Sequence, residues 1–307
     1  MPTNEQRRQA AKRKLDRQLE RRAARAKRRR QLTVAFSAIG VVLAIGVVAL
    51  VVVLTRGGGS DTAAASSSST APAPPSTSTS TSPSAAPPPQ SAPLPAARKT
   101  PLPPTVDCSY PPTVGQPAAK ANTAPPTTGV STVGTVDVTM ATTAGNIGLQ
   151  LNRALAPCTV NSFVSLTKQN FFDNTPCPRL VSSGIYVLQC GDPTGQGTGG
   201  PGYGFANEFP TDQYAPNDPA VKQTPVTYPR GAIAMAHSSQ PNSNGSQFFL
   251  IYKDSPLPPD YTVFGTIDAP GLAVIEKVAA GGDDGSNQAG GGAPKIPVSI
   301  TSMKVQG

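Results

Sequence analysis

The sequence has very little histidine and no tryptophan. Its 307 residues include no tryptophan and a single histidine, His237, and its four cysteines form no Cys-x-x-Cys pair. A zinc site needs several closely spaced cysteine or histidine ligands. No G-x-S-x-G elbow accompanies His237, so the usual serine-hydrolase pattern is missing as well. The sequence therefore predicts no metal and no cofactor.

Positive charge is scarce after residue 30. Of the 26 lysines and arginines, 13 fall within residues 1–30, and residues 31–307 carry 13 basic against 14 acidic side chains. A nucleic-acid-binding domain needs a basic face on the domain itself. The formal net charge of +9 thus describes a basic tail, and no nucleic-acid partner is predicted.

One long stretch lacks charge altogether. Residues 32–54 are 23 consecutive residues without a charged side chain. As a helix they would extend about 34 Å, enough for a hydrocarbon core of about 30 Å. We expect a single-pass transmembrane helix at 32–54 after a basic cytoplasmic tail at 1–31, with a cleaved signal peptide as the alternative.

Charge also sets the expected orientation. The basic residues precede the span, and only Arg56 follows it before Arg98. The positive-inside rule then predicts that the N-terminus lies in the cytoplasm and that the chain after the span lies outside, anchored to the cell membrane.

Residues 55–128 have the composition of a Pro/Ser/Thr/Ala-rich linker, with 17 of the chain's 35 prolines between 57 and 128. Such a composition buries too little apolar surface to fold, so we expect disorder.

Beyond residue 128 the pattern changes to short apolar runs separated by turns. Alternation predicts a hairpin over 133–151, and helical spacing after Pro157 predicts a helix over 154–169. Further strands are expected at 178–182, 185–190, 232–236, 248–252, 261–267 and 296–305, with a second helix at 272–279. Many short strands and only two helices favour a mostly β domain at 129–307, closed into a barrel.

The four cysteines, Cys108, Cys158, Cys177 and Cys190, all follow the apolar span and allow three disulfide pairings. Cys177 and Cys190 sit symmetrically about 183–184, where a hairpin turn is expected, and cross-strand neighbours come close enough to bond. That pairing would leave Cys108 to bond Cys158. Four buried thiols are the alternative.

Two short motifs match known signatures without the context that gives them meaning. Gly195, Gly197 and Gly200 satisfy G-x-G-x-x-G, but Pro201 excludes the helix that phosphate binding requires. Ser165 and Lys168 satisfy the S-x-x-K of penicillin-binding enzymes, but no S-D-N or K-T-G follows. Neither motif predicts a site.

The stretch 231–252, GAIAMAHSSQPNSNGSQFFLIY, has two apolar runs joined by a polar, turn-rich loop. Its Gln247-Phe248-Phe249, followed by Tyr-Thr-Val-Phe-Gly at 261–265, resembles the cyclophilins, a family of peptidyl-prolyl cis-trans isomerases. The resemblance covers roughly residues 130–306. It implies a closed eight-stranded barrel with a helix over each end, and an enzyme that needs no cofactor.

The resemblance also implies roles for single residues. Arg179 takes the position of the family's catalytic arginine, and Gln189 that of a glutamine that holds the substrate backbone. Phe249 would floor the proline pocket. The other residues implied in substrate binding are Tyr186, Val187, Ala236, His237, Ser238, Gln247, Leu257 and Tyr261, of which 236–238 would offer backbone contacts.

The chain departs from the family at two points. The spacing from Arg179 to Gln189 is two residues longer than is usual. Pro256 stands near the place where some members carry tryptophan, and the chain has none. The resemblance therefore allows binding of cyclosporin, the family's cyclic-peptide inhibitor, but more weakly.

The implied chemistry is rotation about X–Pro bonds. The planar amide opposes this rotation with a barrier of about 18–20 kcal/mol. A pocket that binds the twisted amide better than either planar form lowers that barrier. As the amide twists, the prolyl nitrogen regains a lone pair, so a fixed arginine stabilises the twisted form. The sequence thus predicts an isomerase that acts on proline-containing, exported polypeptides and assists their folding.

Two other functions stay open at this point. A cyclophilin-fold module could bind proline peptides or act as a chaperone with little turnover. Alternatively, the protein could be a structural spacer in the cell wall, in which the long Pro/Ser-rich linker is the functional part.

Overall fold

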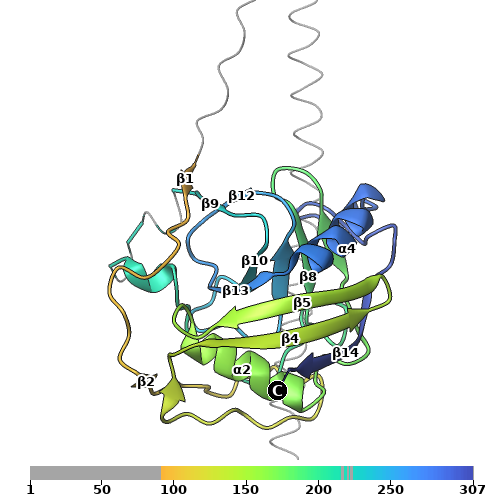
Figure 1. Cartoon of the computed structure of the whole chain (residues 1–307). Coiled ribbons are helices and arrows are strands. Elements are labelled where there is room, and N and C mark those ends of the chain that lie inside the picture. Colours follow the sequence, from red (N-terminus) through yellow and green to blue (C-terminus); the bar gives the residue numbers. More distant parts are fainter. Residues whose placement is uncertain (1–90, 216–217, 220, 222–223, 307) are drawn as a thin grey trace, which may run out of the picture. The chain divides into compact units, whose positions relative to one another are not determined.

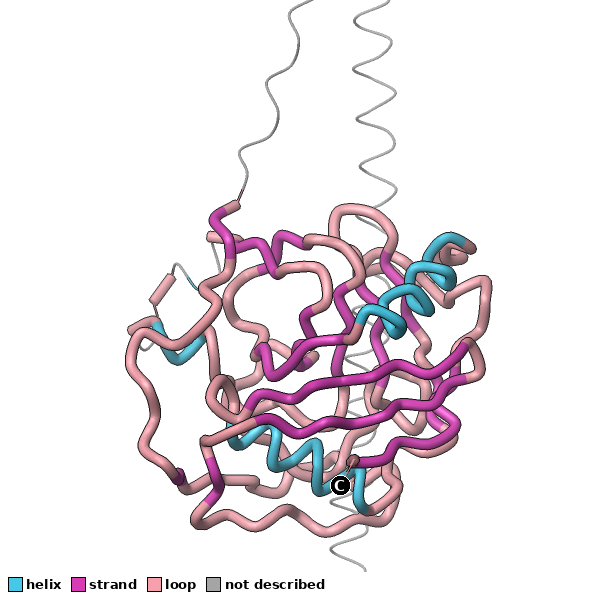
Figure 2. The backbone as a smooth tube through the Cα atoms, in the orientation of Figure 1, coloured by secondary structure: helices cyan, strands magenta, loops and turns pink. Residues whose placement is uncertain are grey.

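The computed structural model describes residues 91–215, 218–219, 221 and 224–306 (Figure 1). The predicted basic tail at 1–31, the predicted span at 32–54 and the linker up to residue 90 lie outside this part of the chain. Among the helices that the structure describes, none has the length and apolar character to cross a membrane. The described residues form a mostly β fold in which helices are few and loops are long (Figure 2).

Nine strands form one curled sheet in the order β6-β14-β4-β5-β13-β10-β11-β8-β7, with every neighbouring pair antiparallel. In that order they cover Thr175–Pro176, Ser299–Val305, Thr135–Thr142, Gly145–Asn152, Val263–Ile267, Ala232–Met235, Phe248–Ile251, Val187–Cys190 and Arg179–Val181. The predicted mostly β class is confirmed.

The prediction of a closed eight-stranded barrel is wrong in strand number and in closure. The hydrogen-bond ladder of the nine-stranded sheet ends at β6 and at β7, which do not pair with each other. These two edge strands are consecutive in the chain, with only Cys177 and Pro178 between them. Pro178 has no backbone N–H to donate to a neighbouring strand. A short chain segment therefore connects the two edge strands, but no hydrogen-bond ladder joins them, and the sheet is an open half-barrel.

The hairpin expected over 133–151 is present as β4 and β5. Its ladder runs without interruption from the pair Thr135–Asn152 to the pair Thr142–Gly145. Thr142 Oγ1 donates to the carbonyl of Gly145 at 2.6 Å and closes the turn. This hairpin forms the front of the molecule in Figure 1.

The α-helices within the described residues are α2 (Pro157–Lys168) and α4 (Ala269–Ala280). Proline at the first position of α2 costs nothing, because the first turn has no hydrogen-bond partner for that N–H. The start of α4 lies three residues before the predicted one. Asp268 fixes this start, since its Oδ1 accepts a hydrogen bond from the N–H of Gly271 at 2.7 Å.

Alternate residues of the central strands face two different apolar clusters. On β11, Phe248 and Leu250 belong to the main core, to which both helices contribute. Phe249 and Ile251 belong to a second cluster on the opposite face of the sheet. Side chains alternate between faces along any strand, and β11 is buried on both. We call the face with the second cluster the outer face.

Residues 91–128, which we call the strap, precede the sheet and lie against it. The strap carries β1 (Ala92–Pro93), which joins β9 (Val226–Tyr228) and β12 (Ser255–Leu257) in a three-stranded sheet. It also carries β2 (Thr105–Val106), which pairs with β3 (Val130–Ser131). In Figure 1 its first part, in orange, runs down one side from β1 to β2. The expectation of disorder up to residue 128 therefore does not hold for residues 91–128.

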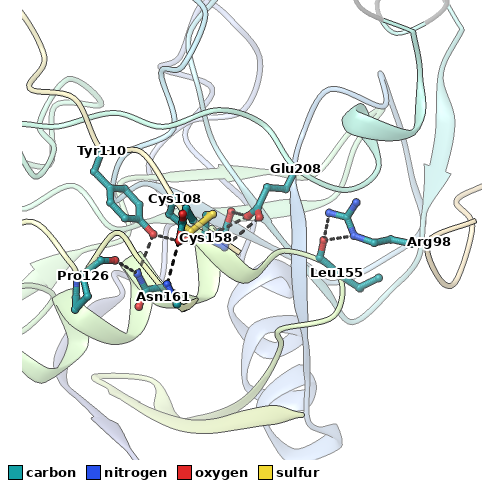
Figure 3. The surroundings of a disulfide bond; sticks show 11 residues. Arg98, Cys108, Tyr110, Pro126, Leu155, Cys158, Asn161 and Glu208 are labelled. Atoms are coloured by element: carbon teal, nitrogen blue, oxygen red, sulfur yellow. Dashed lines mark hydrogen bonds between the residues drawn. A yellow bond between two sulfur atoms is a disulfide. The ribbon is translucent and has the colours of Figure 1, made fainter. Parts of the chain in front are cut away.

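Side-chain contacts bind the strap to helix α2 (Figure 3). Tyr110 is 7% exposed, and its hydroxyl donates to the carbonyl of Cys158 at 2.7 Å. Asn161 donates to the Tyr110 hydroxyl and to the carbonyl of Pro126. Arg98 donates to the carbonyl of Leu155 just before α2. A proline-rich segment is thus ordered by partners outside itself.

Both predicted disulfides are present. Cys108–Cys158 joins the strap to α2, with Cα atoms 5.5 Å apart, and Cys177–Cys190 joins the two sides of the β7–β8 hairpin, with Cα atoms 4.1 Å apart. The ladder pairs Arg179 with Gln189, so Cys190 stands opposite residue 178 and bonds its diagonal neighbour. The hairpin is therefore centred on residue 184, and not between residues 183 and 184 as expected.

Candidate active site

A pocket of about 190 Å³ opens on the outer face of the sheet. Its lining residues are Arg179, Ile185, Val187, Gln189, Ala236, His237, Phe249, Leu257 and Tyr261. They come from five segments that are far apart in the sequence. The pocket is therefore a product of the tertiary fold rather than of any one motif.

Strand register aligns the central residues of this pocket. Arg179 on β7 pairs with Gln189 on β8, and Gln189 pairs with Phe249 on β11. Residues paired across neighbouring strands point to the same face. Arg179, Gln189 and Phe249 therefore form one row across three strands and project together on the outer face.

The floor of the pocket is apolar. Val187, Phe249 and Leu257 are buried, at 3%, 6% and 7% exposure. The ring of Tyr261 meets that of Phe249 edge-on, with centroids 5.5 Å apart, and lies 4.8 Å from the ring of His237. These side chains enclose an apolar slot beside the row of Arg179 and Gln189.

Neutral oxygen atoms hold the guanidinium of Arg179. Its Nε donates to the carbonyl of Gly290 and its Nη2 to that of Ala289, both at 3.0 Å. Its Nη1 donates to Oε1 of Gln189 at 3.2 Å. Burial lowers the pKa of Arg179, an effect that Tyr261 partly offsets. Within the described residues Arg179 takes part in no ion pair, so no carboxylate neutralises its charge.

The two glutamines continue this hydrogen-bond chain. Gln189 Nε2 donates to Oε1 of Gln247 at 2.9 Å, and Gln247 Nε2 donates to the carbonyl of Gly199 at 3.0 Å. The chain runs from the guanidinium, through two side-chain amides, to the backbone of the glycine-rich loop. It fixes the orientation of each amide, because every donor in it has an acceptor.

Asp192 shapes the glycine-rich loop that ends this chain. It is 1% exposed, and its carboxylate accepts from the N–H groups of Thr194, Thr198 and Gly199. Burial acts to raise the pKa of Asp192, but the hydrogen bonds from Thr194 and Gly199 outweigh it and leave the pKa lowered. The carboxylate stays ionised and anchors the loop.

His237 lies at the rim of the pocket. Its two ring nitrogens contact backbone carbonyls, Nδ1 that of Ser238 and Nε2 that of Asp260, each at 2.7 Å. A neutral imidazole has a single N–H and can donate to only one of these carbonyls. The ring forms part of the wall of both pockets.

A second pocket of about 320 Å³ adjoins the first. Gln189, Ala236 and His237 line both pockets, and Ser238 and Gln247 line the second. Its remaining wall includes three strap residues, Thr113, Gln116 and Pro117. Sequence reasoning missed these three, because the strap read as disordered linker and carries no motif.

The structure brings together ten of the eleven residues expected at the site. Arg179, Val187, Gln189, Ala236, His237, Phe249, Leu257 and Tyr261 line the first pocket, and Ser238 and Gln247 line the second. Tyr186 does not belong there. Its ring packs on Tyr252 against the main core, with centroids 5.9 Å apart, and Ile185 lines the pocket instead.

Strand alternation explains the correction at Tyr186. Residues 185, 187 and 189 share one face, as positions two apart in extended chain do. Tyr186 therefore turns to the opposite face. The pocket itself lies on the outer face of the sheet, beside the second apolar cluster.

Within 91–306, apart from the few positions left undescribed, no group of three or more His, Cys, Asp or Glu side chains could hold a metal ion. The side chains that line the site offer an apolar slot, a fixed cation and amide groups. These can grip a peptide and stabilise a lone pair, but they supply no nucleophile.

Known proteins resemble the chain over this same region. The family described as cyclophilin type peptidyl-prolyl cis-trans isomerase/CLD matches residues 135–305. A protein of Mycobacterium leprae, named probable peptidyl-prolyl cis-trans isomerase B, is 59% identical over 312 aligned residues, which cover 99% of this chain and all of the relative. One of the same name from Mycobacterium tuberculosis H37Rv is 54% identical over 199 residues, covering 64% of this chain and 63% of the relative.

A solved cyclophilin-type isomerase from Cryptosporidium parvum aligns at 26% identity with a TM-score of 0.45, covering 57% of this chain and 99% of its own. The family match spans more than half of the chain, and the M. leprae relative is covered along its whole length. The chain therefore belongs to the cyclophilin-type peptidyl-prolyl cis-trans isomerases. It is an enzyme that catalyses cis-trans isomerisation at X–Pro bonds.

Proposed function

We propose that the Arg179 pocket is where this chain twists the X–Pro bond, and that Arg179 is the catalytic residue. The prolyl ring enters the slot above Phe249, between Leu257 and Val187. The guanidinium of Arg179 then faces the prolyl nitrogen. The single observation that carries this assignment is the row of Arg179, Gln189 and Phe249 across three paired strands.

The charge of Arg179 supports this role. A cation stabilises the twisted amide only if nothing nearby cancels it. The guanidinium contacts carbonyl and amide oxygens alone. Three oxygen contacts also fix its direction, so little reorganisation is needed as the lone pair develops.

Gln189 supports the assignment from the substrate side. Its side chain lies between Arg179 and Gln247 and lines both pockets. A peptide whose proline fills the slot must pass over it. We assign Gln189 and the backbone of 236–238 to holding the flanking peptide groups, while the proline ring stays fixed and the preceding carbonyl rotates.

The place of action is also part of the proposal. Residues 32–54 would anchor the chain in the cell membrane, with residues 1–31 in the cytoplasm and the isomerase domain outside. The two disulfides support an oxidising compartment, since such bonds are rare in the cytosol. Exported, proline-containing polypeptides are then the substrates. Cyclosporin remains an expected ligand, held weakly because no indole is present.

The catalytic assignment is tested by exchange NMR on a short X–Pro peptide with the full chain. Wild-type protein should speed cis-trans exchange, and Arg179→Ala should lose about 10²–10³-fold of this rate enhancement. Arg230→Ala is the matched control, because Arg230 is an exposed arginine paired with Glu276 away from the pocket. Full activity in Arg179→Ala would end the assignment. Peptide binding without any exchange enhancement in wild type would favour the binding-module function.

The anchor needs a separate experiment. The full chain expressed in cells should sediment with membranes and resist alkaline extraction. Protease added outside intact spheroplasts should remove the isomerase domain. Recovery of the intact chain in the soluble fraction would contradict the proposed anchor without affecting the catalytic assignment.

A further inference from the structure

We propose that the strap determines substrate specificity, because Thr113, Gln116 and Pro117 form one wall of a subsite that takes an uncharged polar side chain near the substrate proline. These residues lie before residue 135, where the family match begins. The inference rests on the proposed function, since it assumes that proline occupies the Arg179 pocket. It adds the strap to the substrate-binding surface.

The two pockets share a wall. Gln189, Ala236 and His237 line both of them. A peptide anchored by its proline ring in the first pocket therefore passes these shared residues. A side chain one or two positions from the proline then reaches the second pocket, since consecutive residues of an extended chain are about 3.3–3.6 Å apart.

Backbone hydrogen bonds build the strap wall into the fold. Thr113 N–H donates to the carbonyl of Gly202 at 2.9 Å, and Ala119 N–H donates to that of Gly200 at 2.8 Å. Gly204 N–H returns a bond to the carbonyl of Pro111 at 3.0 Å. The strap therefore runs beside residues 200–204 of the glycine-rich loop as a short added edge.

Glycine makes this close approach feasible. Gly202 has a φ of +82°, and a Cβ there would lie 2.9 Å from the backbone nitrogen of Ala118. A side chain at 202 would therefore push the strap away. Glycine at position 202 therefore allows the strap to lie directly against the glycine-rich loop.

The wall is tied down on both sides. Cys108 is bonded to Cys158 before it, and Lys120 after it donates through Nζ to the carbonyls of Phe171 and Asp173. Tyr110 also packs edge-on against Tyr203, which itself lines the second pocket. The wall residues are held by a covalent bond, a cation and ring packing.

The lining chemistry indicates what enters. Of the nineteen residues that line the second pocket, none is Asp, Glu, Lys or Arg, and the polar ones are mainly amides and hydroxyls. A charged side chain would find no partner of opposite charge among these residues. Serine, threonine, asparagine or glutamine can instead exchange hydrogen bonds with Gln116, Ser238 or Ser243.

Charge substitution at Gln116 tests the inference. With the full chain, kcat/KM is measured by exchange NMR for peptides that carry Thr, Lys or Glu at each of the two positions on either side of proline. At one of these positions wild type should prefer Thr. Gln116→Glu should raise the Lys-to-Glu ratio at that position by about fivefold, and Gln116→Lys should lower it by about as much, as expected for a solvent-exposed charge pair.

Thr127→Glu is the matched control, because Thr127 is an exposed strap residue that lines neither pocket. It should leave the ratio unchanged. Ratios that stay the same in both Gln116 variants, or that shift equally in Thr127→Glu, would overturn the strap's role. If no peptide were isomerised, the proposed function would fail on its own. The same ratios taken from peptide affinities by NMR titration would still support or overturn the subsite.

Discussion

Arg179 and Gln189 stand opposite each other on β7 and β8, and the guanidinium of Arg179 donates to the Gln189 side chain at 3.2 Å. Residues 182–186 connect the two strands, and the ladder between them runs from the pair Arg179–Gln189 to the pair Val181–Val187. An even number of extra residues in a hairpin turn keeps each flanking side chain on its face of the sheet, whereas an odd number turns it to the other face.

The loop after α4 holds the other side of Arg179, so Gly291→Ala should reduce activity although Gly291 contacts no substrate. A Cβ at this position would lie 2.0 Å from the carbonyl oxygen of Leu180, and its φ is +71°. The loop must shift and carry the carbonyls of Ala289 and Gly290 away from the guanidinium. We expect kcat/KM on an X–Pro peptide to fall by about ten- to a hundredfold.

Gly285→Ala is the control for that loop. Gly285 has a similar φ of +67°, but a Cβ there meets nothing within 4 Å. Backbone strain is then the same in both variants, and only the displacement differs. Near-wild-type turnover is expected for Gly285→Ala, and equal losses in both would argue against positioning by this loop.

The amide chain behind Arg179 makes a second prediction. Gln247→Ala removes the bonds to Gln189 and to the carbonyl of Gly199. Gln189 then loses the acceptor of its Nε2 group, and we expect kcat/KM to fall about tenfold, which corresponds to the loss of this one bond at about 1–1.5 kcal/mol. Steady-state assays should also show a change in kcat, as misplacement of Arg179 requires. Gln306→Ala, on the exposed C-terminal strand edge, should change neither constant.

Disulfide removal should affect stability in an order set by loop length. The bond between Cys108 and Cys158 closes 50 residues, and that between Cys177 and Cys190 closes 13. Replacing both cysteines of a pair by serine should lower the free energy of unfolding by about 4 kcal/mol for the first pair and about 3 kcal/mol for the second. Urea denaturation of the two double variants measures this. No loss for the Cys108/Cys158 pair would indicate that the strap holds without its covalent bond.

The lowered pKa of Asp192 predicts a pH effect on stability. For a carboxylate whose pKa is lower in the folded state, the stabilisation is present above the unfolded value and is lost as the pH falls through the folded value. Asp192→Asn should therefore unfold more readily at neutral pH and show a shallower decline in stability below about pH 4. Thermal unfolding at a series of pH values checks this. Parallel curves for wild type and variant would contradict it.

The composition of the strap explains why sequence reasoning went wrong there. Residues 91–128 are rich in proline and poor in apolar side chains, the signature of a disordered segment. The composition of a segment describes its own residues and does not include the residues that it contacts in the folded protein. Cys108 and Tyr110 are buried because the main core and α2 supply their partners, and those partners are distant in sequence.

From the sequence by itself, spacing and turn residues predicted the two helices that the structure describes and both disulfides, because these are local properties of the chain. The resemblance to the cyclophilins implied the family and eleven site residues, of which ten line the two pockets. Only the tertiary structure decided that the sheet stays open, that Ile185 rather than Tyr186 reaches the pocket, and that the strap walls a second one. The last of these depends on strap backbone groups and glycine-loop carbonyls some eighty positions apart, such as Ala119 and Gly200. Such hydrogen bonds form only once the chain has folded, and no local sequence pattern predicts them.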